Sequence, residues 1–233
     1  MRVVVTRPLT DGERTAANLR AFGHHVLVAP LMRVEPVPAD LDGKWSGIII
    51  TSANAPAAIG DNPARSSLTG LPVFAVGQRS AQAAQHAGFV EVMSSDGDVH
   101  DLVDAIAARP TAALPLLYLA GENRAADLVG ELSNRGIAVD QRVVYRTVTA
   151  PFPLGLIEAL RAGEVDAILH FSRRSAATYI TAAEAAGLLK PAMAVQHFCL
   201  SAQVAEPLAG ASRIKVADRA DEASLIALLG APA

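Results

Sequence analysis

Small polar residues and arginines recur wherever a short apolar run gives way to an alanine-rich stretch. In "ILHFSRRSAAT", residues 168–178, two serines flank two arginines. Hydroxyl, backbone N–H and guanidinium groups are hydrogen-bond donors that can hold anions such as carboxylates. Six segments of this kind supply Thr6 and Arg7; Ser52, Ala53 and Asn54; Gly77, Arg79 and Ser80; Gly121, Asn123 and Arg124; Ser172, Arg173, Arg174 and Ser175; and Ser201 and Gln203.

The surrounding pattern indicates which elements position these residues. Short apolar runs alternate with segments of helical spacing, which predicts βα units and a mainly parallel sheet, the α/β fold class. Helices are expected over residues 12–22, 80–87 and 124–135, each followed by a glycine. All six polar segments then lie at the carboxyl ends of strands, where helices begin and ligands of α/β proteins bind.

Ordinary helix capping by serine, threonine or asparagine accounts for any one of these loops. It does not account for arginine in four of the six, which favours a large polyanionic ligand. Arginine supplies 17 of the 20 basic residues, and its planar fork matches a carboxylate in two bonds at once. A GC-rich genome would produce the same excess of arginine over lysine.

Composition and motifs exclude several other kinds of site. A net charge of −3 argues against a general nucleic-acid binder, and the one cysteine, Cys199, excludes a disulfide framework or a cysteine-rich zinc site. Residues 96–101, "DGDVHD", are predicted to cap a helix rather than to bind a metal, and His170 and His197 are predicted to be core residues. No P-loop or Gly-x-Gly-x-x-Gly motif is present, so we expect neither cofactor nor metal.

The sequence also bears on location. Only residues 3–5 are apolar before Arg7 and Pro8, which leaves no room for a secretory signal. The longest apolar stretch, residues 105–120, is interrupted by an arginine and two prolines, so it is not expected to span a membrane. We expect a cytoplasmic protein that acts on a small molecule.

Two extended stretches interrupt the βα rhythm. Residues 33–41, "RVEPVPADL", and residues 143–153, "VVYRTVTAPFP", contain alternation and proline, and neither leads directly into a helix. Three of the six polar segments lie between them, which predicts a second domain inserted in the first. The expected boundaries are 1–34 with 149–233 for domain 1, 38–143 for domain 2, and connectors over 35–37 and 144–148.

Tyr145 lies in the second extended stretch. Alternation along a strand would place Val143, Tyr145 and Thr147 on one face and Val144 and Arg146 on the other. A phenol near a site can donate a hydrogen bond to a departing oxygen. Packing of the ring against the connector is the other interpretation.

The order of the segments resembles the uroporphyrinogen-III synthase family over essentially the whole chain. The resemblance is carried by "VVVTRP", "IIITSANA", "VFAVGQRSAQAAQHAGF", "LLYLAGENRAADLVGELSNRGIAVDQRVVYRTV" and "HFSRRSAATY". It implies two flavodoxin-like parallel-sheet domains joined by a two-stranded connector, the second inserted in the first, with the active site between them.

The resemblance also implies an activity. The substrate would be hydroxymethylbilane, a linear tetrapyrrole with acetate and propionate arms, supplied by the preceding enzyme of heme biosynthesis. A monomer would cyclise it, without cofactor or metal, to uroporphyrinogen III through a spiro intermediate. Tyr145 would assist departure of the hydroxyl, and Ser52, Ser80 and Ser172 would hold carboxylates.

Two loops depart from the family pattern. The last one has Ala202 where many members carry a hydroxyl, which weakens the assignment of Ser201 and Gln203. The pair Arg173 and Arg174 replaces a smaller loop, and its arginines are either carboxylate clamps or solvated side chains. Two other functions share the pattern: a non-enzymatic two-domain α/β protein that binds a small polycarboxylate, and an isomerase acting on another polycarboxylate.

Overall fold

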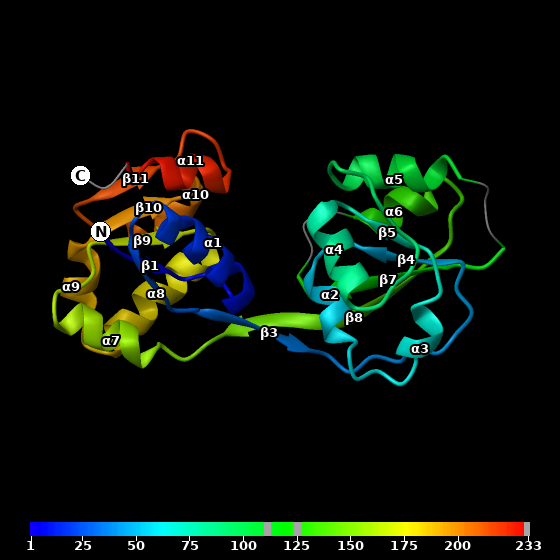
Figure 1. Cartoon of the computed structure of the whole chain (residues 1–233), viewed down its shortest axis with the longest axis horizontal. Helices are drawn as coiled ribbons and strands as arrows, with labels where there is room; N and C mark the ends of the chain where they lie inside the picture. Colours follow the sequence, from blue (N-terminus) through cyan, green and yellow to red (C-terminus); the bar gives the residue numbers. More distant parts are fainter. Residues whose placement is uncertain (110–112, 124–126, 231–233) are drawn as a thin grey trace. The chain divides into compact units, whose positions relative to one another are not determined.

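The protein consists of two compact units. The computed structural model describes residues 1–109, 113–123 and 127–230. Unit 1 comprises Met1–Arg33 and Val148–Ala233, and unit 2 comprises Val34–Thr147. Each unit is built around a mainly parallel sheet with helices beside it (Figure 1), so the predicted α/β fold class is confirmed.

The sheet of unit 1 has five strands in the order β11-β10-β9-β1-β2, all parallel to their neighbours. The strands are β1 (Arg2–Val5), β2 (His25–Val28), β9 (Ala167–His170), β10 (Gln196–Cys199) and β11 (Ile214–Val216). The register pairs Val5 with Leu169 and His170 with Cys199. The loops that follow β1, β9 and β10 therefore leave the sheet at the same edge.

Helices cover both faces of this sheet, as the apolar character of its strands requires. They are α1 (Leu9–Ala21), α7 (Leu154–Arg161), α8 (Arg173–Ala185), α9 (Leu189–Ala194), α10 (Ala202–Ala205), the 3-10 turn η1 (Glu206–Leu208) and α11 (Glu222–Ala227). Leu19 of α1 and Leu225 of α11 pack against Val3 and Val5. Helices α7 to α10 pack on the opposite face, where Val4 and Ile168 point.

The sheet of unit 2 has the order β3-β8-β7-β4-β5-β6. Its strands are β3 (Met32–Pro36), β4 (Gly47–Ile50), β5 (Val73–Ala75), β6 (Val92–Ser94), β7 (Leu116–Gly121) and β8 (Val139–Thr149). The five neighbouring strands β8, β7, β4, β5 and β6 are parallel to one another. Ile50 pairs with Leu119 on one side and with Ala75 on the other.

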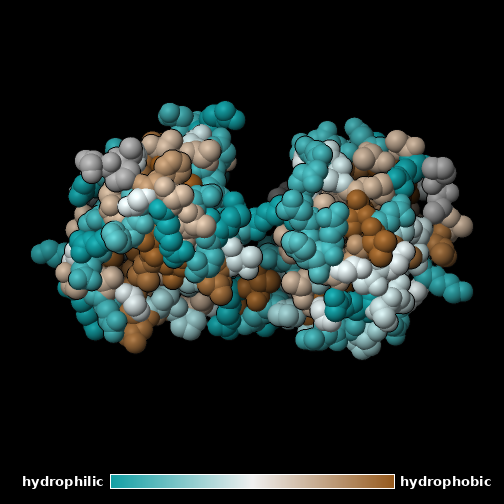
Figure 2. All heavy atoms as spheres, viewed as in Figure 1, coloured by the Kyte–Doolittle hydropathy of each residue, from teal (hydrophilic) through white to brown (hydrophobic). Residues whose placement is uncertain are grey.

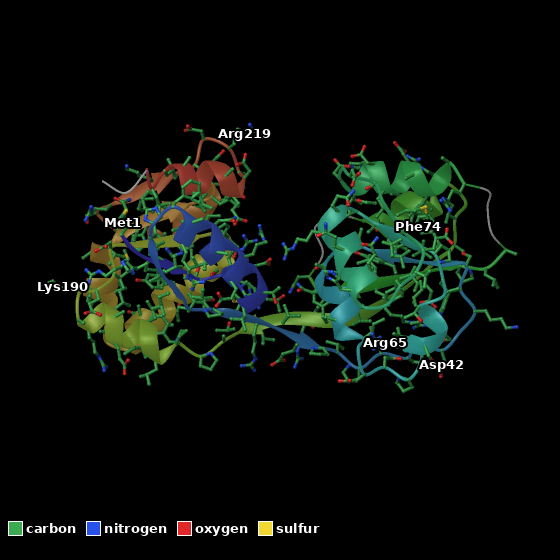
Figure 3. The ribbon with its side chains drawn as sticks, in the orientation of Figure 1. Met1, Asp42, Arg65, Phe74, Lys190 and Arg219 are labelled. Atoms are coloured by element: carbon green, nitrogen blue, oxygen red, sulfur yellow. The ribbon has the colours of Figure 1, made fainter. Side chains whose placement is uncertain are left out.

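Two helical layers enclose this second sheet: α2 (Asn54–Ala58), α3 (Arg65–Leu68) and α4 (Gln78–His86) on one face, and α5 (Val99–Ala107) and α6 (Leu128–Ser133) on the other. Ile48 and Ile50 point to the first layer and Ile49 to the second. Phe74 of β5, labelled in Figure 3, also packs with α5 and α6. Burial on both faces explains why the strands read as continuous apolar runs.

Two paired strands, β3 and β8, carry the chain between the units. Hydrogen bonds run from Ala150 N–H to Leu31 C=O (2.9 Å) and from Val37 N–H to Val144 C=O (2.8 Å). Residue numbers rise along one strand as they fall along the other, so the two strands are antiparallel. Both extended stretches of the sequence thus contribute to this pair.

The helices differ from the expected ones mainly at their starts. Helix α1 begins at Leu9 rather than residue 12, and α4 begins at Gln78 rather than residue 80. Helix α6 begins at Leu128, where the Asp127 side chain caps the Gly130 N–H at 3.0 Å; residues 124–126 of the predicted helix lie outside the described residues. Asp98 caps α5 through a capping box, so the prediction for residues 96–101 is confirmed.

None of the helices in the described part of the chain is long and apolar enough to cross a membrane. Figure 2 shows a largely hydrophilic face interrupted by hydrophobic patches. The large hydrophobic residues with substantial exposure include Leu9, Phe22, Val90 and Leu154. Leu9 and Leu154 begin α1 and α7, Phe22 directly follows α1, and Val90 lies between α4 and β6.

Candidate functional site

In unit 2, three of the predicted loops lie side by side at the carboxyl edge of the sheet. Strands β7, β4 and β5 are consecutive neighbours. Leu119, Ile50 and Ala75 share one level of the register, and Gly121, Ser52 and Gly77 each follow two residues later. The fold therefore brings these three residues into one row.

Tyr145 extends this row on the neighbouring strand β8. It is the register partner of Gly121, directly after an irregularity in the pairing of β7 and β8. The Glu122 N–H donates to Tyr145 C=O at 2.9 Å. The ring is half-buried against the core of the α2–α4 face. Among the described residues, the Tyr145 hydroxyl has no hydrogen-bond partner, so its O–H is available to another molecule.

The loop after β4 is held by its own hydroxyl groups. Ser52 Oγ accepts a hydrogen bond from the Asn54 N–H at 3.2 Å, and Thr51 Oγ1 lies 2.9 Å from the Tyr118 hydroxyl. Ser52, Ala53 and Asn54 are all half-buried. The Ser52 hydroxyl can still donate its own hydrogen to a ligand while it accepts from Asn54.

The loop after β5 leads into α4. Gly77 is the N-cap in an extended conformation, and a side chain at this position would meet nothing within 4 Å. Ser80 is 6% exposed, whereas Arg79 is exposed. Gln78, which no sequence pattern marks, donates from Nε2 to Asp96 Oδ1 at 2.7 Å. That bond ties the loop to the one after β6.

In unit 1, Thr6 and Ser175 are buried in a hydrogen-bonded network. Thr6 Oγ1 donates to Leu169 C=O at 3.1 Å, and Ser175 Oγ donates to Thr6 Oγ1 at 3.2 Å. The Ser175 N–H donates to Ser172 Oγ at 3.1 Å, so Ser172 caps α8. Thr6 is 0% and Ser175 is 5% exposed. These two hydroxyls hold β1 against the start of α8, and Ser172 is the exposed member of the group.

Arg7 is enclosed by residues of its own unit. Its guanidinium lies 4.3 Å from the centre of the Phe171 ring. Nη1 donates to Glu222 Oε2 at 2.8 Å and to Thr15 Oγ1 at 3.2 Å. Asp11 lies 3.7 Å from Nη2, and the side chain is 16% exposed. The charge of Arg7 is thus already balanced inside the unit.

Glu222 of α11 is the acceptor at the centre of this cluster. Arg7 Nη1, Arg14 Nη2 and Thr15 Oγ1 each donate to its carboxylate at 2.8 Å. Burial alone would raise the pKa of Glu222, but the Thr15 hydrogen bond and the charges of Arg7 and Arg14 outweigh it and lower the pKa. No local signal could have identified Glu222, because 215 residues separate it from Arg7.

The two arginines at the start of α8 differ from each other. Arg173 Nε donates to Glu206 Oε2 at 2.7 Å, and both side chains are more than half exposed. Arg174 is exposed and makes no ion pair with a described residue. Ser201 precedes α10 and is half-buried, and Gln203 is exposed. All four residues lie at the carboxyl edge of the sheet, beyond β9 and β10.

Of the two remaining predicted residues, Asn123 is exposed and Arg124 lies outside the described residues. No group of three or more histidine, cysteine, aspartate or glutamate side chains in the described ranges could hold a metal ion. A mainly apolar hollow of about 800 Å³ lies between α1 and α11 and reaches Arg14 and Glu222. None of the predicted site residues lines that hollow.

His170 and His197 lie beneath the loops of unit 1. Both are 0% exposed, which confirms their prediction as core residues, and His170 Nε2 lies 3.1 Å from His197 Nδ1. Burial lowers the pKa of His170 to about 3 and the pKa of His197 to about 4. Cys199 is also buried, and burial raises its pKa to about 12. These groups are suited to packing rather than to acid–base chemistry at neutral pH.

The fold and the loops define a class: a two-unit α/β protein whose parallel sheets carry hydroxyl and glycine residues at their carboxyl edges. The family model described as uroporphyrinogen-III synthase HemD matches residues 13–227. The chain belongs to the uroporphyrinogen-III synthase family, whose activity lies in tetrapyrrole and heme biosynthesis.

Solved structures agree with this assignment of the fold. Uroporphyrinogen-III synthetase from Helicobacter pylori aligns with a TM-score of 0.64 at 17% identity and covers 98% of both chains. A mutant uroporphyrinogen III synthase from the extremely thermophilic bacterium Thermus thermophilus aligns with a TM-score of 0.51 at 19% identity, covering 99% of this chain and 98% of that one. No curated protein sequence matches the chain significantly.

Proposed function

We propose that the protein is a lyase that closes hydroxymethylbilane into uroporphyrinogen III, with loss of water and inversion of the terminal pyrrole ring. The observation that carries the proposal is the row at the carboxyl edge of unit 2, where Tyr145 follows Ser52 and Gly121 along the sheet and its hydroxyl has no hydrogen-bond partner among the described residues. Membership of the uroporphyrinogen-III synthase family supports it.

The reaction begins at the hydroxymethyl group of the bilane. The electron pair of the adjacent pyrrole nitrogen expels the hydroxyl, which takes the proton of the Tyr145 phenol and leaves as water. The product of this step is a protonated azafulvene, an azafulvenium ion that keeps the pyrrole N–H proton, together with the Tyr145 phenolate. Transfer of a proton to a leaving group in the transition state typically accelerates a reaction by about 10² to 10⁴-fold.

Ring inversion follows, and none of its steps is a redox step or uses a cofactor. The substituted carbon of the terminal ring attacks the azafulvene methylene and forms the spiro intermediate. The bond from that carbon to its original bridge carbon then breaks, and the bridge carbon bonds to the unsubstituted carbon of the same ring. Loss of a ring proton restores the aromatic pyrrole and reprotonates Tyr145, so the sum of the steps is the loss of one water.

Binding of the acetate and propionate arms falls to the loops. Ser52, Ser80 and Ser172 are proposed to donate hydrogen bonds to carboxylates, with backbone N–H groups at the starts of the helices beside them. Arg174 adds an exposed positive charge. We propose that holding the bilane folded, so that attack occurs at the substituted carbon, is the main contribution of the protein. It acts as a cytoplasmic monomer that receives its substrate from the preceding enzyme.

The test is to supply freshly made hydroxymethylbilane, to oxidise the products and to separate the porphyrin isomers. We expect isomer III to predominate. Spontaneous closure without enzyme, run in parallel, provides the reference for isomer I. Accumulation of isomer I alone would refute the proposal. Saturable binding of the bilane without turnover would then favour the non-enzymatic polycarboxylate-binding function.

A further inference from the structure

Gly121 and the ring of Tyr145 are in unusually close contact. A Cβ atom added to Gly121 would lie 2.6 Å from Tyr145 Cζ, 2.7 Å from its hydroxyl oxygen and 2.8 Å from Cε2. Outside their own and the adjacent residues, real Cβ atoms essentially never come within 3.0 Å of a heavy atom. The Tyr145 phenol therefore occupies the space that any side chain at position 121 would fill.

The backbone conformation does not explain this glycine. Glycine is required where φ is positive, and Gly121 is not among the positive-φ glycines of the described chain. It is a strand residue at the end of β7. An alanine would suit its backbone, so the space taken by the ring is the remaining reason for glycine at this position.

An irregularity in the sheet produces the close approach. Ala120 pairs with Val143, whereas Gly121 pairs with Tyr145, so Val144 is an extra residue on β8. Such bulges bend a strand and re-aim its side chains, and they are frequent beside active sites. The hydrogen bond from Glu122 N–H to Tyr145 C=O, at 2.9 Å, fixes the backbone directly beyond it.

We propose that Gly121 is a positioning residue for Tyr145 rather than a ligand of the substrate. Its missing side chain, together with the bulge, lets the phenol lie over the end of β7, in the row that contains Ser52. The catalytic consequence rests on the proposed function, whereas the contact itself does not. A methyl group at 121 would push Tyr145 Cζ from 2.6 Å to an ordinary contact of at least 3.4 Å. A misplacement of about 1 Å can cost about 10²-fold in rate.

The experiment compares Gly121→Ala with Gly70→Ala. Gly70 is exposed, has no positive φ, and would place its Cβ within 4 Å of nothing. The chain has 3 tyrosines, so protein with ¹³C-labelled tyrosine rings gives a small set of NMR signals. Tyr145→Phe identifies the signals of Tyr145.

We expect Gly121→Ala to shift the Tyr145 signals and to lower kcat by about 10 to 100-fold, with a smaller change in KM. Gly70→Ala should leave the signals and kcat unchanged. In the Tyr145→Phe background the same substitution should cost little further activity, because the hydroxyl that it displaces is already absent. Unshifted Tyr145 signals in Gly121→Ala would overturn the proposal, as would a raised KM with kcat and signals unchanged.

A second pair of variants covers the case in which Gly121→Ala does not fold. Tyr145→Ala removes the ring, so adding Gly121→Ala to it should not lower the melting temperature further. A double variant that is less stable than Tyr145→Ala would contradict the contact. If the wild-type protein produces isomer I alone, the proposed function fails, while shifted Tyr145 signals would still support the geometric part.

Discussion

His170 Nε2 lies 3.1 Å from His197 Nδ1 inside unit 1, and this contact joins β9 to β10 beneath the loops of the candidate site. Within the described chain the other ring nitrogens, His170 Nδ1 and His197 Nε2, have no hydrogen-bond partner. Tyr179 packs edge-on against both rings. The Ala192 backbone raises the pKa of His197, but burial outweighs this effect, so both histidines are neutral in the folded protein at neutral pH.

The pair makes the protein sensitive to acid. Burial lowers the folded-state pKa of His170 to about 3 and that of His197 to about 4, from an ordinary value of 6.5. The unfolded chain therefore binds more protons below pH 6.5. The free energy of unfolding is at its full value above that pH and falls as the pH drops toward 4, by about 2 kcal/mol per histidine at pH 5.

Urea unfolding at pH 7.5 and pH 5 measures this loss. We expect His197→Gln to reduce the difference in unfolding free energy between the two pH values, even if the variant is less stable at both. His86→Gln is the control, because it removes an exposed histidine of α4 and leaves the pair intact. An unchanged pH difference in His197→Gln would show that other groups cause the acid sensitivity.

Replacement of Tyr145 by phenylalanine tests the proposed acid. The hydroxyl has no partner among the described residues, so its loss should change the melting temperature little. The rate of bilane closure should fall by about 10² to 10⁴-fold, because the leaving hydroxyl then lacks its proton donor. Porphyrin isomer III measured in samples quenched at fixed times gives the rate. Full activity in Tyr145→Phe would assign the ring a packing role only.

Much of the fold was predictable because its signals are local. Apolar runs mark the buried parallel strands, and glycines such as Gly23 and Gly136, both with positive φ, mark where helices end. The predicted starts of α1 and α4 lie two or three residues after the observed ones. The first residues of these helices, such as Gln78, are polar or isolated and do not continue the helical spacing of apolar residues. The edge strand β6 has three half-buried residues and no such signal.

The chemistry of the candidate site was less predictable, because it depends on residues far apart in the sequence. Arginines in four of the six loops favoured a polyanionic ligand, but the charge of Arg7 is balanced by Glu222 from the other end of the chain. The role proposed for Gly121 depends on a one-residue irregularity opposite Tyr145. The spacing of residues in the sequence predicts neither the Arg7–Glu222 pair nor the Gly121–Tyr145 contact, because the packing of distant segments and the register between strands determine which side chains meet.

Glu222 is expected to anchor α11 to the loop after β1. Glu222→Gln removes the charge that accepts from Arg7, Arg14 and Thr15, and we expect a loss of about 1 to 3 kcal/mol at pH 7. Because the folded-state pKa of Glu222 is lowered, its contribution is present above the ordinary carboxyl pKa of about 4.3 and is lost as the pH falls below it.

The matched control for Glu222 is Glu13→Gln. Glu13 also pairs with an arginine, Arg20, at 3.3 Å, but both side chains are about half exposed. Exposed pairs contribute little, so this variant should unfold at nearly the wild-type urea concentration. Equal losses in the two variants would contradict a special role for the Arg7–Glu222 cluster.

The arginines at the start of α8 should differ in their effect on substrate binding. Arg173 already pairs with Glu206 at 2.7 Å, whereas Arg174 has no ion pair with a described residue. A charge-assisted hydrogen bond to a carboxylate contributes about 1.5 to 3 kcal/mol. We therefore expect Arg174→Ala to raise KM for hydroxymethylbilane by at least about tenfold, with kcat little changed.

Arg173→Ala should raise KM less than Arg174→Ala, because in the wild-type protein Glu206 competes with a ligand for the Arg173 guanidinium. Glu206→Gln provides the complementary test: it frees Arg173 without removing a positive charge, and KM should stay the same or fall. Measurements at two salt concentrations separate a direct carboxylate contact from long-range attraction, which salt screens. If neither arginine changes KM, the carboxylates are held by the serines and backbone N–H groups of the loops, and the pair is a solvated surface feature.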